Sequence, residues 1–434
     1  MDLQMDFQTA LDFTKADFAA YITRYWKEHL QNKEVVLDDE RKRDLEKYLG
    51  IVQRFAPCWL EEFDVCDKAL GCEPGTYASR ELAKDSSRPK APHECTSWLL
   101  NPPITPNGHR ILHKVRDANY REITIMRFRT ECCKKYNRWL GLGNLGRMAP
   151  CMGMNEHGLA IIMNSGETTT ENNYPGLTTP NMARCMLEQC SCIDEALELY
   201  KEIIRGNCYS HGASGSIFMM ADTRRGIIAE NTASHFAIGN VDDKFLIRAN
   251  AWHLPGMECH STTTYRGIVG NAQRECQVRE GIRNALKEKG TVSLEDCLAI
   301  ARSREGTVDR SNRAVCTDFT NSASTFEIDS EYPFLSTAYL AIGPQDQTVF
   351  MPVPMCATQY PAQMVDGSWS DEAFKDQKEL GVNSDLTKFT ELEERMMAVY
   401  RPAQEKARAL AATSPEGAQA ILQAAFEECC KYHA

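Results

Sequence analysis

The distribution of apolar residues predicts helices at both ends of the chain. Over residues 1–72 apolar positions recur at helical spacing, for example at Leu45, Leu49 and Val52, and Pro57 predicts a break because proline disrupts a helix interior. A second amphipathic, alanine-rich region from about residue 383 predicts two C-terminal helices, the first of them interrupted near Pro402.

The middle of the chain predicts β-strands joined by tight turns. Short apolar runs bounded by turn residues predict strands at residues 110–115, 159–164, 216–222, 227–232 and 245–249. In this pattern Asn164 ends its strand. Residues 181–204 follow Pro180 and carry apolar side chains at helical spacing, which predicts one helix that packs on the strands.

A polar stretch with several prolines separates the helical and the strand-rich regions. Residues 72–94 include Pro74, Pro89 and Pro92 and predict an exposed connection. Immediately after it stands Cys95-Thr96-Ser97-Trp98, followed by a hairpin whose second strand ends at Arg116. A guanidinium close to a thiol favours the thiolate, which is the reactive form.

Cys95 is the candidate nucleophile. If the peptide bond between Glu94 and Cys95 is cut, the new α-amino group can accept the thiol proton, so one residue supplies both nucleophile and base. This interpretation predicts a self-processing precursor, with residues 1–94 removed or retained as a separate chain. The alternative is that Cys95 is a free thiol packed in the core.

Several motifs resemble, in the same order, those of the N-terminal nucleophile (Ntn) hydrolases of linear amides: isopenicillin-N acyltransferases, choloylglycine hydrolases and acid ceramidase-like amidases. They are Cys95-Thr96-Ser97, Val115-Arg116-Asp117-Ala118-Asn119, Met152-Gly153-Met154-Asn155-Glu156-His157-Gly158-Leu159 and Arg248-Ala249-Asn250. Residues 313–326 and 341–344 are also similar to Ntn dipeptidases, and the likeness covers residues 45–355. The resemblance implies an α+β fold, a four-layer αββα sandwich. Residues 1–94 would be a helical pro-segment, and residues 95–434 the core with its C-terminal helices.

The resemblance also implies roles for individual residues. The nucleophile, a nearby arginine and three asparagines that hold the amino group or stabilise the oxyanion are expected to be catalytic: Cys95, Arg116, Asn119, Asn164 and Asn250. Asn119 stands where the family usually has aspartate, and Asp117 is the alternative for that role. Substrate contacts are expected from Trp98, Asp117 and Arg266, with Arg274 as the alternative to Arg266.

Composition narrows the setting in which this chemistry would take place. The 434 residues are 43% hydrophobic and 25% charged, as in globular proteins, and the N-terminal region lacks the apolar core of a signal peptide. We therefore expect a cytoplasmic protein without a membrane span and with reduced thiols among its 18 cysteines. The net charge of −11 argues against a nucleic-acid partner, and the cysteine spacing argues against a structural zinc site.

Four alternatives to the expected reaction stay open at the level of sequence. The expected reaction is hydrolysis of a linear amide, such as an acyl-amino acid, through a Cys95 thioester, with no cofactor and no metal. An acyl-CoA-dependent acyltransferase and a dipeptidase share the same motifs. A non-catalytic scaffold that keeps the Ntn shape and a papain-like protease are the rivals from other classes. The two self-cleaved chains are expected to stay associated, and the C-terminal helices could pack on the core or on a second copy.

Overall fold

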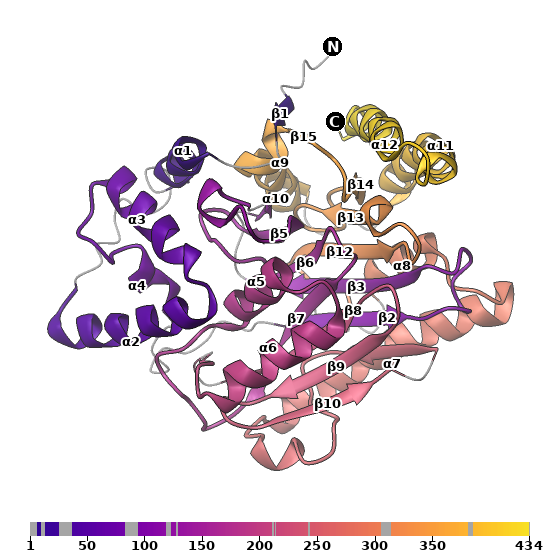
Figure 1. Ribbon diagram of the computed structural model, residues 1–434. Coiled ribbons are helices and arrows are strands. Elements are labelled where there is room, and N and C mark those ends of the chain that lie inside the picture. Colours follow the sequence, from indigo (N-terminus) through magenta and orange to yellow (C-terminus); the bar gives the residue numbers. More distant parts are fainter. Residues whose placement is uncertain are drawn as a thin grey trace.

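The computed structural model describes most of the chain. Described are residues 7–9, 14–25, 37–82, 94–118, 123–126, 129–210, 212, 214–241, 244–304, 314–380 and 385–433. Figure 1 shows the N-terminal helices on one flank, two stacked sheets in the centre and the C-terminal helices beside the sheets.

The N-terminal region is helical, as predicted. It comprises β1 (Phe7–Thr9), α1 (Lys15–Tyr25), α2 (Asp39–Phe55), α3 (Cys58–Leu70) and α4 (Ala78–Glu81). Asp38 caps α2 by accepting a hydrogen bond from the backbone nitrogen of Arg41 at 2.8 Å, and Pro57 separates α2 from α3. Gly71 ends α3 with a φ of 65°, a left-handed conformation that glycine adopts without strain.

One sheet has seven strands in an antiparallel meander. Its order is β10-β9-β8-β7-β6-β5-β4, so each strand pairs with its neighbour along the chain. The strands are β4 (Ile123–Met126), β5 (Trp139–Asn144), β6 (Met152–Asn155), β7 (Ala160–Thr168), β8 (Ser214–Ala221), β9 (Gly226–Asn231) and β10 (Phe236–Asn240). The predicted hairpin of β8 and β9 is confirmed, with Ser216 opposite Asn231.

The other sheet has six antiparallel strands and contains Cys95. Its order is β11-β2-β3-β12-β13-β14, which brings strands from distant parts of the chain together. The strands are β2 (Glu94–Leu100), β3 (Arg110–Asp117), β11 (Phe245–Arg248), β12 (Thr320–Ile328), β13 (Thr337–Ala341) and β14 (Met351–Pro354). The predicted hairpin is formed by β2 and β3, in which Cys95 lies opposite Arg116.

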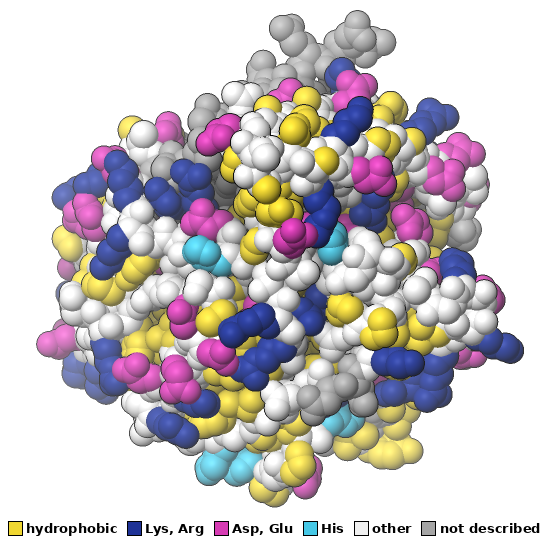
Figure 2. Space-filling model, turned by 45° about the vertical axis from the view of Figure 1, so that its right-hand side comes forward, with side chains coloured by type: hydrophobic (Ala, Val, Ile, Leu, Met, Phe, Trp, Pro, Cys, Tyr) yellow, Lys and Arg dark blue, Asp and Glu magenta, His cyan; other side chains and the backbone are white. Residues whose placement is uncertain are grey.

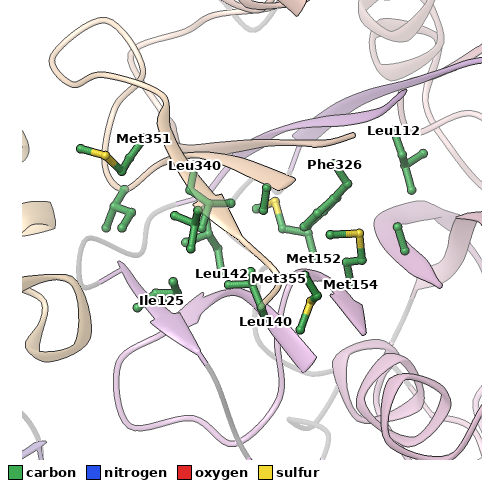
Figure 3. Packing of buried hydrophobic residues seen from close by; sticks show 14 of the residues in the cluster. Leu112, Ile125, Leu140, Leu142, Met152, Met154, Phe326, Leu340, Met351 and Met355 are labelled. Atoms are coloured by element: carbon green, nitrogen blue, oxygen red, sulfur yellow. The ribbon is translucent and has the colours of Figure 1, made fainter. Parts of the chain in front are cut away.

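The two sheets pack face to face over an apolar core. Leu112, Phe326, Leu340 and Met351 of the six-stranded sheet lie in one buried cluster with side chains of the seven-stranded sheet, namely Ile125, Leu140, Leu142, Met152 and Met154 (Figure 3). Interdigitated apolar side chains of this kind hold aligned sheets together.

Helices cover the outer face of each sheet. On the seven-stranded sheet lie α5 (Thr179–Gln189) and α6 (Ile193–Arg205), with α2 and α3 packed beside them in a second core. On the six-stranded sheet lie α7 (Tyr265–Lys289) and α8 (Leu294–Ala301), which form a third core with Trp98 and Leu100. The predicted αββα order of layers is confirmed.

Two helix predictions are wrong in detail. The single helix expected over residues 181–204 is two helices, because the chain becomes extended at Cys190 and restarts at Ile193. The C-terminal helix α11 (Thr387–Leu410) continues through Pro402 to its end, and α12 (Pro415–Cys430) begins after Ser414, whose side chain accepts from the nitrogen of Gly417. In the described part of the chain the remaining elements are β15 (Gln359–Pro361), which pairs with β1, α9 (Ala362–Asp366), α10 (Ser368–Leu380) and 3-10 turns at Glu131–Cys133, Glu258–His260 and Pro333–Leu335.

The face of the molecule seen in Figure 2 carries the mixed charges that are usual for a globular protein. Figure 2 shows basic and acidic side chains interspersed over one face of the molecule. None of the described helices combines the length with the apolar composition that crossing a membrane requires.

Candidate active site

The backbone of Cys95 is held by side chains where an adjacent strand ends. Strand β11 pairs with β2 only as far as Arg248, which lies opposite Ser97. Beyond that point Asn250 Oδ1 accepts a hydrogen bond from the Cys95 nitrogen at 2.9 Å. A side-chain acceptor thus takes the position that a strand carbonyl would occupy. Cys95 itself is only 6% exposed.

Arg274 of α7 holds the other end of the same residue. Its Nη1 donates to the carbonyl oxygen of Cys95 at 2.9 Å, and its Nη2 donates to Asn250 Oδ1 at 3.0 Å. Nη2 also donates to Asn271 Oδ1 at 2.7 Å and lies 3.4 Å from Glu94 Oε2. One buried guanidinium therefore links both residues of the expected cleavage bond to the asparagine beside them.

Arg116 faces the space on the thiol side of the sheet. Directly opposite residues in antiparallel strands have Cβ atoms about 4.5–5.5 Å apart and share a face, so the side chains of Arg116 and Cys95 start next to each other on one face of the sheet. Arg116 Nη1 donates to Asn144 Oδ1 of the seven-stranded sheet at 2.9 Å. The arginine is thereby fixed between the two sheets.

Asn164 lies inside β7, four residues before the last residue of the strand, Thr168, and not at the strand end that the sequence predicts. Its Oδ1 accepts from Ser97 Oγ at 2.8 Å and from Lys114 Nζ at 2.9 Å. Its Nδ2 donates to the carbonyl oxygens of Ala249 at 2.8 Å and Arg248 at 3.2 Å. Both hydrogens of the amide thus bind main-chain carbonyls, and this arrangement positions the segment that carries Asn250.

Asn250 has a different hydrogen-bond pattern. Its Nδ2 donates to Ser165 O at 2.7 Å, which uses one of the two hydrogens of the amide. Among the described residues no acceptor takes the second hydrogen. Asn250 can therefore hold the Cys95 nitrogen through its oxygen and still offer a donor to a developing oxyanion.

Two expected substrate contacts lie on the opposite face of the six-stranded sheet. Because side chains alternate along a strand, Trp98 points away from the Cys95 face, is fully buried and stacks on His113 with ring centres 4.0 Å apart. Asp117 lies opposite Glu94 and accepts from Thr320 Oγ1 at 2.5 Å and Thr317 Oγ1 at 3.3 Å. Burial raises the pKa of Asp117 to about 6, although Arg274 and the two threonines oppose the shift. Neither side chain is placed to contact a substrate at the thiol.

Two predicted side chains lie outside the described structure, and two residues of the site were not predicted. Asn119 and the side chain of Arg266 lie outside the described part of the structure, whereas Arg274, the alternative, is at the centre of the site. Lys114 and Asn271 were not predicted. Lys114 stands two residues before Arg116 on β3, so the two side chains share a face of the sheet. This spacing in the sequence could have indicated that Lys114 faces the site.

Helix α3 of the N-terminal region packs tightly on the core. Glu62 of α3 forms a buried ion pair with Arg184 of α5 at 2.8 Å, and Arg184 also pairs with Glu188 at 2.8 Å. Trp59 Nε1 donates to Glu188 Oε2 at 2.8 Å. A disulfide joins Cys58 of α3 to Cys133, so the expectation of wholly reduced thiols is wrong for this pair, while the other cysteines are free.

Residues 105–286 match the model of the family described as acyl-coenzyme A:6-aminopenicillanic acid acyl-transferase. The predicted resemblance to Ntn enzymes of the isopenicillin-N acyltransferase type is confirmed. The matched segment begins after Cys95 and includes Arg116, Asn164, Asn250 and Arg274. A search of curated protein sequences found no match.

Solved structures of Ntn enzymes are similar at low sequence identity. A Caenorhabditis elegans N-acylethanolamine-hydrolyzing acid amidase ortholog has 12% identity and a TM-score of 0.37, covering 54% of this chain and 92% of its own. A variant of the conjugated bile acid hydrolase from Clostridium perfringens has 15% identity and a TM-score of 0.41, covering 62% and 98%. Penicillin V acylase from Agrobacterium tumefaciens has 14% identity and a TM-score of 0.37, covering 58% and 84%.

Proposed function

We propose that the protein is a self-processing cysteine amidase that cleaves a linear amide, such as an acyl-amino acid, through a thioester on Cys95. The observation that carries the proposal is the hydrogen bonding of the Cys95 backbone. Its nitrogen is bound by Asn250 and its carbonyl by Arg274, both through buried side chains. Buried backbone groups need hydrogen-bond partners in any protein, and here both partners are polar side chains, which can keep hold of the Cys95 backbone after the bond to Glu94 is cut.

Self-cleavage would start from the chain as it stands. The Cys95 sulfur attacks the carbonyl carbon of Glu94, the C–N bond breaks, and the thiol proton passes to the Cys95 nitrogen. Water then hydrolyses the thioester, which leaves the Glu94 carboxylate and a free α-amino group on Cys95. Residues 1–94 and 95–434 would be the two products, and the former would be the pro-segment.

Substrate cleavage would repeat the same chemistry on an external amide. The α-amino group accepts the thiol proton and passes it to the departing amine, while the acyl group remains on sulfur until water releases it. Asn250 Oδ1 would hold the amino group, because it already binds that nitrogen. The second hydrogen of Asn250 Nδ2 would bind the oxyanion, Arg116 would stand beside the thiolate, and Asn164 would position the Asn250 segment.

Mass spectrometry of the denatured protein tests the proposal. The parent should give two fragments divided at Cys95, and Cys95→Ala should remain intact. Cys259→Ala, which removes an exposed free thiol, is the matched control and should be processed like the parent. Cleavage of Cys95→Ala at the same bond would show that another protease does the cutting.

Asn250 gives a sharper test of the catalytic step in protein that is already processed. Loss of one oxyanion donor typically lowers turnover by about 100- to 1000-fold. Asn250→Ala should therefore lose at least this much activity on a library of acyl-amides, with Cys95 acylation visible in acid-quenched parent protein. A folded, processed Asn250→Ala protein with near-parental turnover would refute the role.

The matched family description supports one second candidate, transfer of an acyl group from coenzyme A to an amine. The two reactions share the thioester and differ in what resolves it. Incubation with acyl-CoA, with and without an amine acceptor, separates them, because only a transferase forms the new amide. A small-molecule amide is the proposed partner. The cytoplasmic location stays a prediction, and the Cys58–Cys133 disulfide weighs against it.

A further inference from the structure

Two histidines and a glutamate from three separate segments meet beyond the end of β7. Glu171 Oε1 lies 3.0 Å from His235 Nδ1 and 2.8 Å from His260 Nδ1. The two imidazole rings stack with centres 4.2 Å apart. One nitrogen or oxygen atom from each residue lies within 4.8 Å of the others. None of these residues takes part in the proposed amide chemistry.

The scaffold around the cluster fixes each member. Thr232 Oγ1 donates to Glu171 Oε2 and accepts from the backbone nitrogen of His235 at 2.9 Å. Asn173 Nδ2 donates to the carbonyl oxygen of Ala233 at 2.8 Å, which ties the segment of Glu171 to the turn that carries His235. Thr232 thus orients the Glu171 carboxylate, and the bond from Asn173 holds the two segments together without involving any side chain of the cluster.

A third set of bonds fixes the segment of His260. The backbone nitrogen of Thr262 donates to Thr168 O at 2.8 Å, and the nitrogen of Thr168 donates to Thr263 Oγ1 at 3.1 Å. These bonds join the chain after the 3-10 turn to the last residue of β7, three residues before Glu171.

We propose that Glu171, His235 and His260 bind a divalent transition-metal ion of the zinc class. Two imidazole nitrogens and a carboxylate oxygen are ligands that Zn²⁺ takes in proteins, at about 2.0–2.2 Å. At these bond lengths and tetrahedral angles, ligand atoms stand roughly 3.3–3.5 Å apart. The separations of 3.0 and 2.8 Å from Glu171 Oε1 need to open by roughly 0.3–0.7 Å to reach these values.

The exposure of the cluster leaves room for a further ligand. The side chain of His235 is 55% exposed, whereas those of Glu171 and His260 are 22% exposed. Water can therefore complete a site with three protein ligands. The hydrogen bond from Thr232 to Glu171 supplies the outer contact that orients a ligating carboxylate.

The ion would connect the segments that follow two parts of the candidate active site. Glu171 follows Asn164 by seven residues along the chain, and His260 follows Asn250 by ten. A shared ion would clamp the segment after β11 to the extension of β7 and to the turn between β9 and β10. We assign it a structural role that does not require the amide reaction to occur.

Equilibrium binding of Zn²⁺ to the full chain tests the site. The parent is compared with His235→Gln and His260→Gln by isothermal titration and by metal analysis after dialysis. Each variant should lose one bound equivalent, with an affinity drop greater than the about 10- to 100-fold that loss of an outer hydrogen-bond partner causes. His157→Gln, which alters an exposed histidine outside the cluster, is the matched control and should bind as the parent does.

The free thiols of the chain require a second readout, because cysteines also bind zinc. Co²⁺ in place of Zn²⁺ distinguishes the two, since thiolate ligands add a near-ultraviolet charge-transfer band that nitrogen and oxygen ligands lack. The expected result is a Co²⁺ site without this band that disappears in His260→Gln. Equal Zn²⁺ stoichiometry and affinity in the folded parent and both variants would overturn the proposal, as would binding accompanied only by the thiolate band.

Discussion

The buried ion pair between α3 and α5 gives the sharpest prediction about how the residues before Cys95 stay on the core. Arg184 is 1% exposed, contacts Glu62 and Glu188 at 2.8 Å each, and lies over the Trp59 ring with its Cζ 4.6 Å from the ring centre. Removing one partner of a buried pair typically costs about 3–5 kcal/mol, because the other charge is left without compensation.

The two ends of this network should differ in cost. Glu62→Gln leaves Arg184 paired with Glu188, so we expect the free energy of unfolding to fall by about 3 kcal/mol, the lower end of the range. Arg184→Met leaves two buried carboxylates without a cation, so we expect about 5 kcal/mol. The deficit of Arg184→Met should shrink as pH falls, since protonation of the two carboxyl groups removes the uncompensated charge.

Urea unfolding at several pH values measures both effects, and an exposed ion pair across the same boundary is the control. Arg54 of α2 contacts Glu202 of α6 at 2.8 Å, with side chains 52% and 54% exposed. Exposed pairs contribute about 0–1 kcal/mol, so Glu202→Gln should be nearly neutral. If Glu62→Gln is as mild as Glu202→Gln, the buried network does not hold the N-terminal helices, and the reasoning is refuted.

Two further predictions concern the carboxyl group behind the nucleophile and the disulfide. Burial raises the pKa of Asp117 to about 6, so the folded state binds more protons than the unfolded state between about pH 4 and 6, and this group lowers stability as pH rises through that window. Asp117→Asn should remove up to about 3 kcal/mol of this decline in the free energy of unfolding. An unchanged dependence of the unfolding free energy on pH would contradict the prediction. The denatured, unreduced protein should take up 16 alkyl groups on its 18 cysteines, the two of the disulfide being protected, and Cys58→Ser should expose Cys133 while the control Cys132→Ser leaves the bond intact. Alkylation of all 18 cysteines before reduction would exclude the bond.

Local pattern predicted the elements that carry the nucleophile. The short apolar run at residues 110–115 and the turn before it predict the hairpin of β2 and β3, in whose register Arg116 lies opposite Cys95. The same signals predict β8 and β9. These elements depend on neighbours in sequence, and residue types alone report them well.

The extension of β7 past Asn164 shows where local reasoning fails. Ser165 and Gly166 are typical of a strand end, yet the strand continues to Thr168. A Cβ atom at Gly166 would lie 2.7 Å from the Trp252 Nε1 and 2.9 Å from the Gly215 carbonyl carbon, so this glycine permits close packing within the sheet. Gly166 is required by its contact with Trp252, which lies 86 positions later in the sequence, and a local pattern contains no information about so distant a residue.

The contacts at the centre of the candidate site also join residues that are far apart in the sequence. The carbonyl of Cys95 is bound by Arg274, 179 positions later, and its nitrogen by Asn250, 155 positions later. The order of the six-stranded sheet explains both contacts, since all seven strands of the other sheet lie along the chain between β3 and β11, the strand that pairs with β2. Binding of the Cys95 backbone therefore depends on complete assembly of both sheets. Self-cleavage that occurs only once β11 and α7 lie against β2 would release the nucleophile only in the folded molecule, and this physical link between folding and the proposed activation follows from where the strands lie.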